Sequence, residues 1–432
     1  MKKIVNDSLK FTLYHETLEN GLNVVIIEKP DFQKVSGYFT TNFGSIDTKF
    51  QIGETLYDTP LGIAHFLEHI VFHTDDESDA SIEFEKLSAE VNAFTSKTET
   101  TYYFSTLENV DECINLLLDF VQTPYFSEKI VESERKIIEQ EINMINDNVD
   151  EELNSGLLNL MFKDSPIKNE IGGTVDTIKE ITPELLNLCY ETFYHPSNMN
   201  LIIIGGVEHN HIMRLIRKNQ SSKKFKFIEN KPTVIYPEEI NEVYKTKNVE
   251  EKEVSIPKVN VGLKLNLDDK NIDDLIRIKR NLGISFLFNY FYQYAGVFYN
   301  KLDKLNLVND SFQYVVNTRR VGPYVDFNID INEVDLFEEK FIESLLAIPD
   351  TKIDKTKFNI LKKKYYASII KGLNEYYLLK EMSEVYLKTG IKPLKYLKLI
   401  TDVKIKDLDE AKKYIKKENI SINTFLIKKE LN

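Results

Sequence analysis

Residues 60–72 of the chain read PLGIAHFLEHIVF. Pro60 and Gly62 are turn-forming residues, so the chain is expected to bend there. From Ile63 to Phe72 the sequence contains neither Pro nor Gly and repeats apolar residues at helical intervals. We therefore predict a helix that begins just after Gly62 and packs into the core.

Two histidines and a glutamate lie within this helix. His65 and His69 are four residues apart, so they share one face and can bind one metal ion. Glu68, on the flank of that face, can take a proton from a metal-activated water and pass it to a leaving amine. The order HxxEH is the inverted form of the zinc-peptidase helix motif. An exposed helix that merely carries His and Glu is the alternative, but buried polar groups need partners and the flanking residues are apolar.

A third protein ligand is expected from residues 132–144, which read ESERKIIEQEINM. Glu134 and Glu141 are seven residues apart and therefore share a helical face. Glu141 lies between Ile138 and Ile142, which places it on the inward face, and we assign it as the third metal ligand. Glu134 is assigned as a supporting carboxylate that orients a histidine. The alternative for each glutamate is an ordinary solvated position on a helix.

Composition narrows the class of protein. The chain has 432 residues, of which 42% are hydrophobic, so two or more compact domains are expected. The net charge of -13 argues against nucleic-acid binding, which usually requires a basic surface. The N-terminal residues lack the apolar core of a signal peptide, and no apolar run is long enough to span a membrane. Cys113 and Cys189 are expected to be buried free thiols, with a single disulfide as the alternative, and a cytoplasmic location is predicted.

The rest of the chain alternates between expected strands and helices. Strands are predicted at 23–27, 35–42, 92–104 (as a pair) and 199–204, and helices at 63–72, 80–90, 108–122, 127–147 and 183–193. Periodicity fades between residues 218 and 248, which are predicted to be a linker. The order of elements then returns, with strands near 253–266 and 311–331, helices near 272–303, and further helices to the end. The predicted domains are therefore 1–217 and 249–432.

An internal duplication explains why the order of strands and helices repeats in the second half. At an offset of 221 residues, Leu61-Gly62-Ile63-Ala64 recurs as Leu282-Gly283-Ile284-Ser285, and the strand pair at 92–104 falls on 313–325. Two unrelated α+β domains are the alternative. At this offset His65, Glu68, His69 and Glu141 fall on Phe286, Asn289, Tyr290 and Lys362. Only the first half is therefore predicted to bind a metal.

The spacing of these motifs resembles the pitrilysin/insulinase family of inverzincin zinc metallopeptidases. HFLEH is followed after 71 residues by the glutamate of ERKIIEQEINM, and the segments NAFT at 92–95 and FYHPSNM at 193–199 are similar to further motifs of that family. The size is similar to the subfamily that includes mitochondrial processing peptidase, and in particular to short bacterial members of the YfmH and AlbF type.

The resemblance implies a fold class and a set of roles. It implies two homologous α+β domains, each a mixed or antiparallel sheet covered by helices. It also implies one zinc ion per chain, with His65, His69 and Glu141 as ligands, Glu68 as general base and Glu134 as support. Family members bind the substrate as an added strand beside the segment that matches Asn92, Ala93, Phe94 and Thr95. Ordinary strand positions are the alternative for these four residues.

One departure from the family pattern predicts a partner. The family's second half usually supplies an Arg and a Tyr to the substrate, but no Arg occurs here between Arg280 and Arg319. Tyr314 remains as a candidate for the Tyr in the matching stretch, 299–314, but the pair is broken. We therefore expect a heterodimer in which a zinc-less paralogous subunit supplies the Arg and Tyr. A homodimer is the less favoured arrangement.

The sequence thus favours a zinc-dependent endopeptidase that cleaves unfolded peptides or leader segments inside a closed chamber. A non-catalytic scaffold subunit and a zinc hydrolase of non-peptide substrates are the alternatives. The natural peptide is left open between peptide-antibiotic maturation and a housekeeping role. His73, four residues after His69, is expected to be an exposed residue at the end of the helix, with a position that lines the cleft as the alternative. His195 is expected to have a structural role in a turn.

Overall fold

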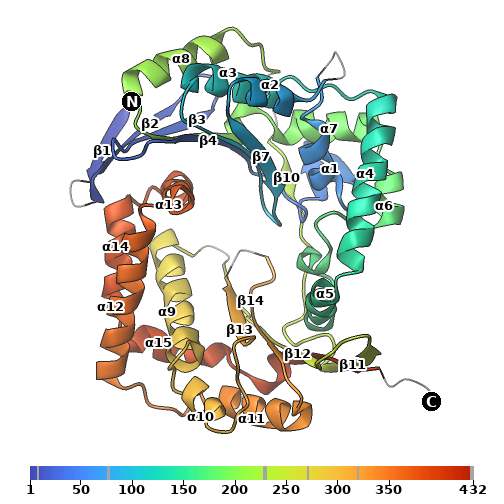
Figure 1. Ribbon diagram of the computed structural model, residues 1–432, viewed down its shortest axis with the longest axis vertical. Helices are drawn as coiled ribbons and strands as arrows, with labels where there is room; N and C mark the ends of the chain where they lie inside the picture. Colours follow the sequence, from blue (N-terminus) through green and yellow to red (C-terminus); the bar gives the residue numbers. More distant parts are fainter. Residues whose placement is uncertain (7–8, 75–77, 227–230, 270–271, 319–320, 429–432) are drawn as a thin grey trace. The chain divides into compact units, whose positions relative to one another are not determined.

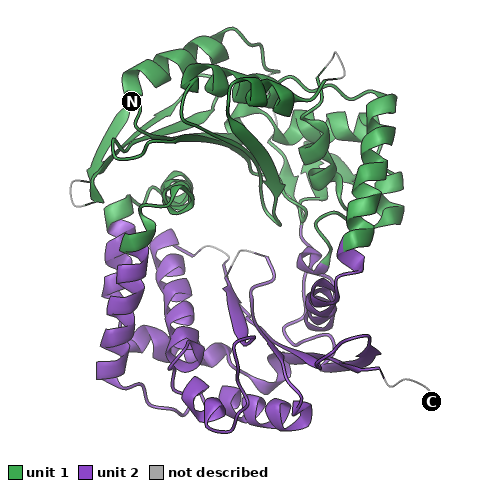
Figure 2. Cartoon of the chain, in the orientation of Figure 1, with its two compact units in different colours: residues 1–144, 169–235, 370–394 green, residues 145–168, 236–369, 395–432 purple. Residues whose placement is uncertain are grey.

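The computed structural model describes residues 1–6, 9–74, 78–226, 231–269, 272–318 and 321–428 (Figure 1). The chain forms two compact units (Figure 2). Unit 1 comprises residues 1–144, 169–235 and 370–394, and unit 2 comprises residues 145–168, 236–369 and 395–432. Each unit thus contains one segment from the other half of the sequence, which the continuous domains 1–217 and 249–432 do not include.

Unit 1 is built on a mixed sheet of seven strands in the order β1-β2-β3-β9-β4-β8-β7. Its strands are β1 (Lys2–Asn6), β2 (Phe11–Thr17), β3 (Asn23–Glu28), β4 (Val35–Thr41), β7 (Glu90–Thr95), β8 (Thr100–Thr106) and β9 (Met199–Gly205). All neighbouring strands are antiparallel except β3 and β9. A small second sheet is formed by β5 (Lys49–Ile52), β6 (Thr55–Asp58) and β10 (Thr233–Val234). The seven-stranded sheet ends at β7, whose outer edge no other described strand covers.

Helices pack on the apolar face of this sheet, namely α1 (Ile63–Ile70), α2 (Ala80–Lys86), α3 (Val110–Val121) and α8 (His209–Ser221). Helices α4 (Glu128–Asn146), α6 (Val175–Lys179) and α7 (Pro183–Phe193) contribute side chains to the same core. The core between them includes Phe39 of β4, Tyr102 of β8, and Phe66 and Leu67 of α1, all of which are fully buried. The predicted elements of the first half are confirmed, whereas α8 and the two opening strands lie outside the ranges predicted from sequence.

Unit 2 repeats this arrangement with five strands in the order β11-β15-β12-β14-β13. The strands are β11 (Lys247–Lys252), β12 (Lys258–Lys264), β13 (Gln313–Asn317), β14 (Tyr324–Asp330) and β15 (Ile420–Ile427). The helices are α5 (Val149–Met161), α9 (Asp274–Tyr292), α10 (Tyr299–Asp303), α11 (Val334–Leu346), α12 (Lys355–Gly372), α14 (Pro393–Asp402) and α15 (Ile405–Ala411).

The two sheets have the same topology. In chain order, β3, β4, β7, β8 and β9 of unit 1 correspond to β11, β12, β13, β14 and β15 of unit 2. Every pairing keeps its direction, including the single parallel pair, which is β3–β9 in one sheet and β11–β15 in the other. The predicted fold of two homologous α+β domains is therefore confirmed.

The second face of each sheet is covered by a helix from the other half of the sequence. Helix α5, from the first half, packs on β12 and β15 of unit 2. Helix α13 (Tyr376–Thr389), from the second half, packs on β9 of unit 1. Both helices follow the long helix of their own half, α4 or α12, so the duplication extends to this exchange.

Two details differ from the sequence predictions. The helices predicted up to the end of the sequence are wrong for residues 420–427, which form β15, and this strand has the position in its sheet that β9 has in unit 1. Residues 218–248, predicted as a linker, include the end of α8, the short strand β10 and the first residues of β11. Among the described helices, none is both long and apolar enough to cross a membrane.

Candidate metal centre

Helix α1 is held in place by the core of unit 1. Ile63, Phe66, Leu67 and Ile70 are at most 1% exposed, and the Tyr102 hydroxyl donates a hydrogen bond to the Leu67 carbonyl oxygen at 3.2 Å. The apolar side of the helix therefore faces the sheet, which leaves the histidine face directed away from it.

Two glycines allow another segment to pass close to the start of α1. Gly62, the N-cap residue, has φ of 90°, and a Cβ placed there would be 2.3 Å from the Gly172 carbonyl oxygen. Gly173 has φ of 73°, and its Cβ would be 2.5 Å from the Leu61 carbonyl oxygen. Any side chain at either position would clash with backbone and strain a left-handed conformation. The Gly172–Gly173 segment, absent from the sequence predictions, thus forms one wall beside His65.

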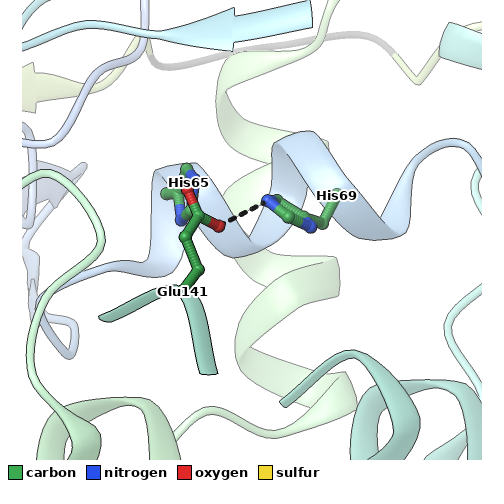
Figure 3. A group of neighbouring side chains, drawn as sticks. All are labelled: His65, His69 and Glu141. Atoms are coloured by element: carbon green, nitrogen blue, oxygen red, sulfur yellow. Dashed lines mark ion pairs between the residues drawn. The ribbon is translucent and has the colours of Figure 1, made fainter. Parts of the chain in front are cut away.

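His65, His69 and Glu141 converge from two helices (Figure 3). The two imidazole rings project from α1, and the Glu141 carboxylate reaches them from α4. His65 Nε2 lies 3.7 Å from Glu141 Oε1, and His69 Nε2 lies 3.4 Å from Glu141 Oε2. Potential ligand atoms of the three residues all lie within 4.8 Å of one another.

These separations fit one zinc ion. Ligands about 2.0–2.1 Å from a tetrahedral zinc are roughly 3.3 Å from one another. Separations of 3.4 and 3.7 Å between the Nε2 atoms and the carboxylate match that spacing and exceed normal hydrogen-bond lengths. Two imidazoles and one carboxylate also form a protein ligand set that catalytic zinc sites use.

The surroundings shift the pKa values of the two histidines in opposite directions. Burial, together with the nearby His69 ring, lowers the pKa of His65 to about 4, so His65 is neutral at pH 7. Burial alone would lower the pKa of His69 as well, but the carboxylates of Glu134, Glu68 and Glu141 outweigh it and raise that pKa. A cation at this position is therefore favoured electrostatically, whether it is a proton or a metal ion.

Glu134 lies behind His69, where the sequence predicts a supporting carboxylate. Its side chain is only 8% exposed, and its Oε2 atom is 3.4 Å from His69 Nδ1. Its Oε1 atom is 2.8 Å from His73 Nε2. Burial opposes ionisation of Glu134, but the two histidines more than compensate and lower its pKa to about 2. The expectation that His73 is an exposed residue at the helix end is wrong, because its side chain is only 21% exposed and is hydrogen-bonded to Glu134.

Glu68 is held by a strand rather than by another helix. The Thr95 hydroxyl, on β7, donates a 2.6 Å hydrogen bond to Glu68 Oε2. Burial raises the pKa of Glu68, although this hydrogen bond and the nearby His69 oppose the shift. A carboxylate with a raised pKa is a stronger base than a solvated one, which is the property that a general base requires.

The predicted substrate-binding residues lie on the edge strand β7. Asn92 is exposed, and its Oδ1 atom accepts a 2.8 Å hydrogen bond from the Ala93 backbone N–H. Phe94 packs toward α13, with the Lys380 ammonium 5.4 Å from its ring centroid. Thr95, as described above, contacts Glu68. The strand that could accept an added peptide strand is therefore in direct contact with the candidate base.

Comparison with known proteins identifies the family. The sequence profile described as Insulinase (Peptidase family M16) matches residues 43–175, and the profile described as Peptidase M16 inactive domain matches residues 180–365. A curated relative from Bacillus subtilis (strain 168), named "Uncharacterized zinc protease YmfH", is 38% identical over 379 residues, which are 87% of each chain. The chain belongs to peptidase family M16.

A solved structure and a further relative are also similar to this chain. The crystal structure of a putative M16-like peptidase from Alicyclobacillus acidocaldarius has a TM-score of 0.91 at 28% identity and covers 97% of this chain and 99% of its own. A probable mitochondrial-processing peptidase subunit beta from Arabidopsis thaliana is 30% identical over 206 residues, 47% of this chain and 37% of that protein. This second match therefore spans well under half of the relative's own length.

The second half of this M16 chain has no equivalent cluster among its described residues. Phe286, which corresponds to His65, is buried against Phe358 and Tyr365 of α12, with ring centroids 5.9 and 4.9 Å away. Asn289, which corresponds to Glu68, accepts a 2.6 Å hydrogen bond from the Tyr314 hydroxyl. These apolar and neutral groups agree with the description of the matching profile as an inactive domain.

Some contributions to the site could not be predicted from the sequence. The FYHPSNM segment forms a turn in which His195 Nδ1 is 2.8 Å from Ser197 Oγ. This contact agrees with the structural role predicted for His195. The roles of Thr95 and His73 depend on contacts across 27 and 61 residues of sequence, respectively. Only the Gly172-Gly173 pair carries a local signal, because two successive glycines mark a tight approach of the backbone.

Proposed function

We propose that this M16 chain is a zinc-dependent endopeptidase. The observation that carries the proposal is the convergence of His65, His69 and Glu141 beside a carboxylate, Glu68, that is hydrogen-bonded to the edge strand β7. The names of relatives such as "Uncharacterized zinc protease YmfH" support the choice of zinc. A scaffold subunit without activity would not need to bury these ionisable groups, which cost stability unless they are paired.

The residues divide the chemistry among themselves. Zinc bound at this site would supply a Lewis acid that polarises the scissile carbonyl and lowers the pKa of a coordinated water. Glu68 is placed to remove the proton from the attacking water and to deliver it to the leaving amine. Thr95 fixes the orientation of Glu68, and Glu134 lies beside the outer nitrogen of His69.

The edge of β7 supports a peptide substrate that binds in extended form. A peptide added as a further strand is held by main-chain hydrogen bonds, which do not depend on its side chains. Only an unfolded segment can add in this way, so unfolded peptides or leader segments are the proposed substrates. Asn92, Ala93, Phe94 and Thr95 would line this strand, within reach of Glu68.

Substitution of Glu68 tests the proposal most directly. Glu68→Gln keeps the size of the side chain but cannot accept a proton, so cleavage of an extended fluorogenic peptide should fall about 10²–10⁴-fold. Zinc content, measured by mass spectrometry of the metal, should stay at one ion per chain. Glu83→Gln, on the exposed surface of α2, is the matched control and should retain full activity. Unchanged activity of Glu68→Gln would exclude this mechanism.

We further propose that a zinc-less paralogous subunit completes the enzyme. The hydroxyl of Tyr314, the candidate for the tyrosine of the expected Arg–Tyr pair, donates a hydrogen bond to Asn289. Arg280 is paired with Asp269 at 2.7 Å. Arg319 lies outside the described residues. A partner that contributes an Arg and a Tyr would enclose the peptide in a chamber. The pure chain should therefore cleave peptides much more slowly than the assembly purified through a tag from its natural source, and equal rates would refute the need for a partner.

The two cysteines support a cytoplasmic location for this enzyme. Cys113 and Cys189 are both buried free thiols, as predicted. Burial raises the pKa of Cys113 to about 11 and that of Cys189 to about 12, so both are unreactive thiols. Reduced cysteines are the usual state in a reducing compartment.

A further inference from the structure

Helix α1 and the turn after it carry a series of three histidines, each four residues after the one before. His73 continues the four-residue spacing of His65 and His69, but it lies beyond the end of the helix at Ile70. Its backbone is fixed on both sides. The His73 N–H donates to the Ile70 carbonyl oxygen at 3.1 Å, and His73 forms an antiparallel β-bridge with Asp79, the N-cap residue of α2.

The Glu134 carboxylate is shared unequally between His73 and His69. The 2.8 Å contact from His73 Nε2 to Oε1 is a hydrogen bond of normal length. The 3.4 Å contact from His69 Nδ1 to Oε2 is longer than a normal hydrogen bond. Glu134 is buried, so its orientation depends on a donor that holds it, and His73 is the donor at hydrogen-bond distance.

We propose that His73 is a positioning residue for the metal centre: by holding Glu134, it keeps a carboxylate behind His69 Nδ1 and strengthens zinc binding. This inference rests on the proposed zinc site. When Nδ1 carries the proton and faces Glu134, Nε2, which points toward Glu141, has a free lone pair for the metal. A carboxylate at Nδ1 also makes the imidazole a more basic ligand.

Loss of His73 would leave Glu134 as a buried carboxylate without its closest donor. Such a group turns toward water or takes up a proton, and in either case it no longer faces His69 in a fixed orientation. Partners of metal-ligating histidines typically change metal affinity about 10–100-fold when removed. His73 acts one step further out, so we expect a loss of about 10-fold for His73→Ala, at the lower end of that range.

The test is zinc affinity measured on the metal-free full chain by competition with a chromophoric chelator. His73→Ala and His73→Asn should bind zinc about 10-fold more weakly, because the amide nitrogen of Asn is too close to the backbone to replace Nε2. His73→Gln should bind as the wild type does, since its amide nitrogen has the reach of Nε2. His211→Ala, an exposed histidine on α8 paired with Asp111, is the control and should change nothing.

A double-mutant cycle separates this role from general support of the fold. If His73 acts through Glu134, then His73→Ala should cause no further loss of zinc affinity in a Glu134→Ala background. The proposal is overturned if His73→Ala and His73→Asn bind zinc as tightly as the wild type, if His73→Gln is as weak as His73→Ala, or if the loss is undiminished without Glu134. A wild-type chain that fails to bind zinc would instead refute the proposed function, and this inference with it.

Discussion

Corresponding pairs of helices contact each other through different side chains in the two units. In unit 1, α1 and α4 face each other through His65, His69 and Glu141, with Glu134 behind them. In unit 2, the corresponding helices α9 and α12 meet through aromatic rings, as Phe286 packs on Phe358 and Tyr365. The sheet beneath each pair has the same topology, so the fold requires a contact at this place but not a polar one.

The difference shows where function costs stability. Partly buried histidines and carboxylates must be desolvated and paired, whereas aromatic side chains of similar size gain stability from burial alone. The second half contains the arrangement that stabilises the contact between helices. The first half contains the arrangement that can bind a cation. Exchanging residues between the two halves tests this difference.

The largest effect is expected from putting residues of the second half into the first. In a His65→Phe/His69→Tyr variant, both imidazole ligands are lost, so zinc should fall from one ion per chain to essentially none and peptide cleavage should fall more than about 10³-fold. Metal analysis and an activity assay measure both. The far-ultraviolet circular dichroism should be preserved, because unit 2 tolerates Phe286 and Tyr290 at the corresponding positions. A variant that still holds a full equivalent of zinc would show that the ligands are elsewhere.

A smaller effect is expected from removing one aromatic ring from the contact between α9 and α12 in unit 2. Phe286 is 1% exposed, and Phe286→Ala should lower the free energy of unfolding by about 3–5 kcal/mol through lost burial and the resulting cavity. Urea unfolding measures the change, and the zinc affinity of the folded variant should equal that of the wild type. Tyr294→Ala, at a side chain that is 78% exposed, is the control. An equally stable Phe286→Ala protein would mean that the aromatic pair does not hold α9 and α12 together.

The smallest effect concerns one buried ionisable group in each unit. In unit 1 the buried Lys380 of α13 is paired with Glu99 at 3.1 Å, whereas in unit 2 Asp326 of β14 is largely buried with its Oδ1 atom unpartnered among the described residues. Burial raises the pKa of Asp326 to about 6. The folded pKa is higher than the unfolded one, so the stability gained from the neutral carboxyl is complete below about pH 4 and is lost as the pH rises through 6.

Asp326→Asn should remove this pH dependence. The amide cannot ionise, so the variant should gain on the order of 2 kcal/mol relative to the wild type between pH 4 and pH 7. Thermal unfolding at a series of pH values measures the gain. Asp176→Asn, at a side chain that is 93% exposed, should show no such trend. A constant difference between Asp326→Asn and the wild type at all pH values would show that Asp326 titrates normally in the folded protein.

Much of the first half could be predicted because its signals are local. Helix α1 has an apolar stripe and a preceding glycine, and α7 and β9 begin at the residues predicted for them. The second half was harder to predict, since β15 lies in a stretch where helices were expected. The duplication itself nevertheless requires a strand there. The exchange of α5 and α13 gives no sequence signal, because a helix with an apolar face does not indicate which sheet it covers.

The sequence by itself determined the spacing of His65, Glu68 and His69 on one helical face and of Glu134 and Glu141 on another, because helical periodicity is a property of neighbouring residues. Only the tertiary structure decided that these two faces meet, that Thr95 holds the base and that His73 reaches Glu134. Such contacts join residues far apart in the chain, and their geometry depends on how the helices pack against a common sheet.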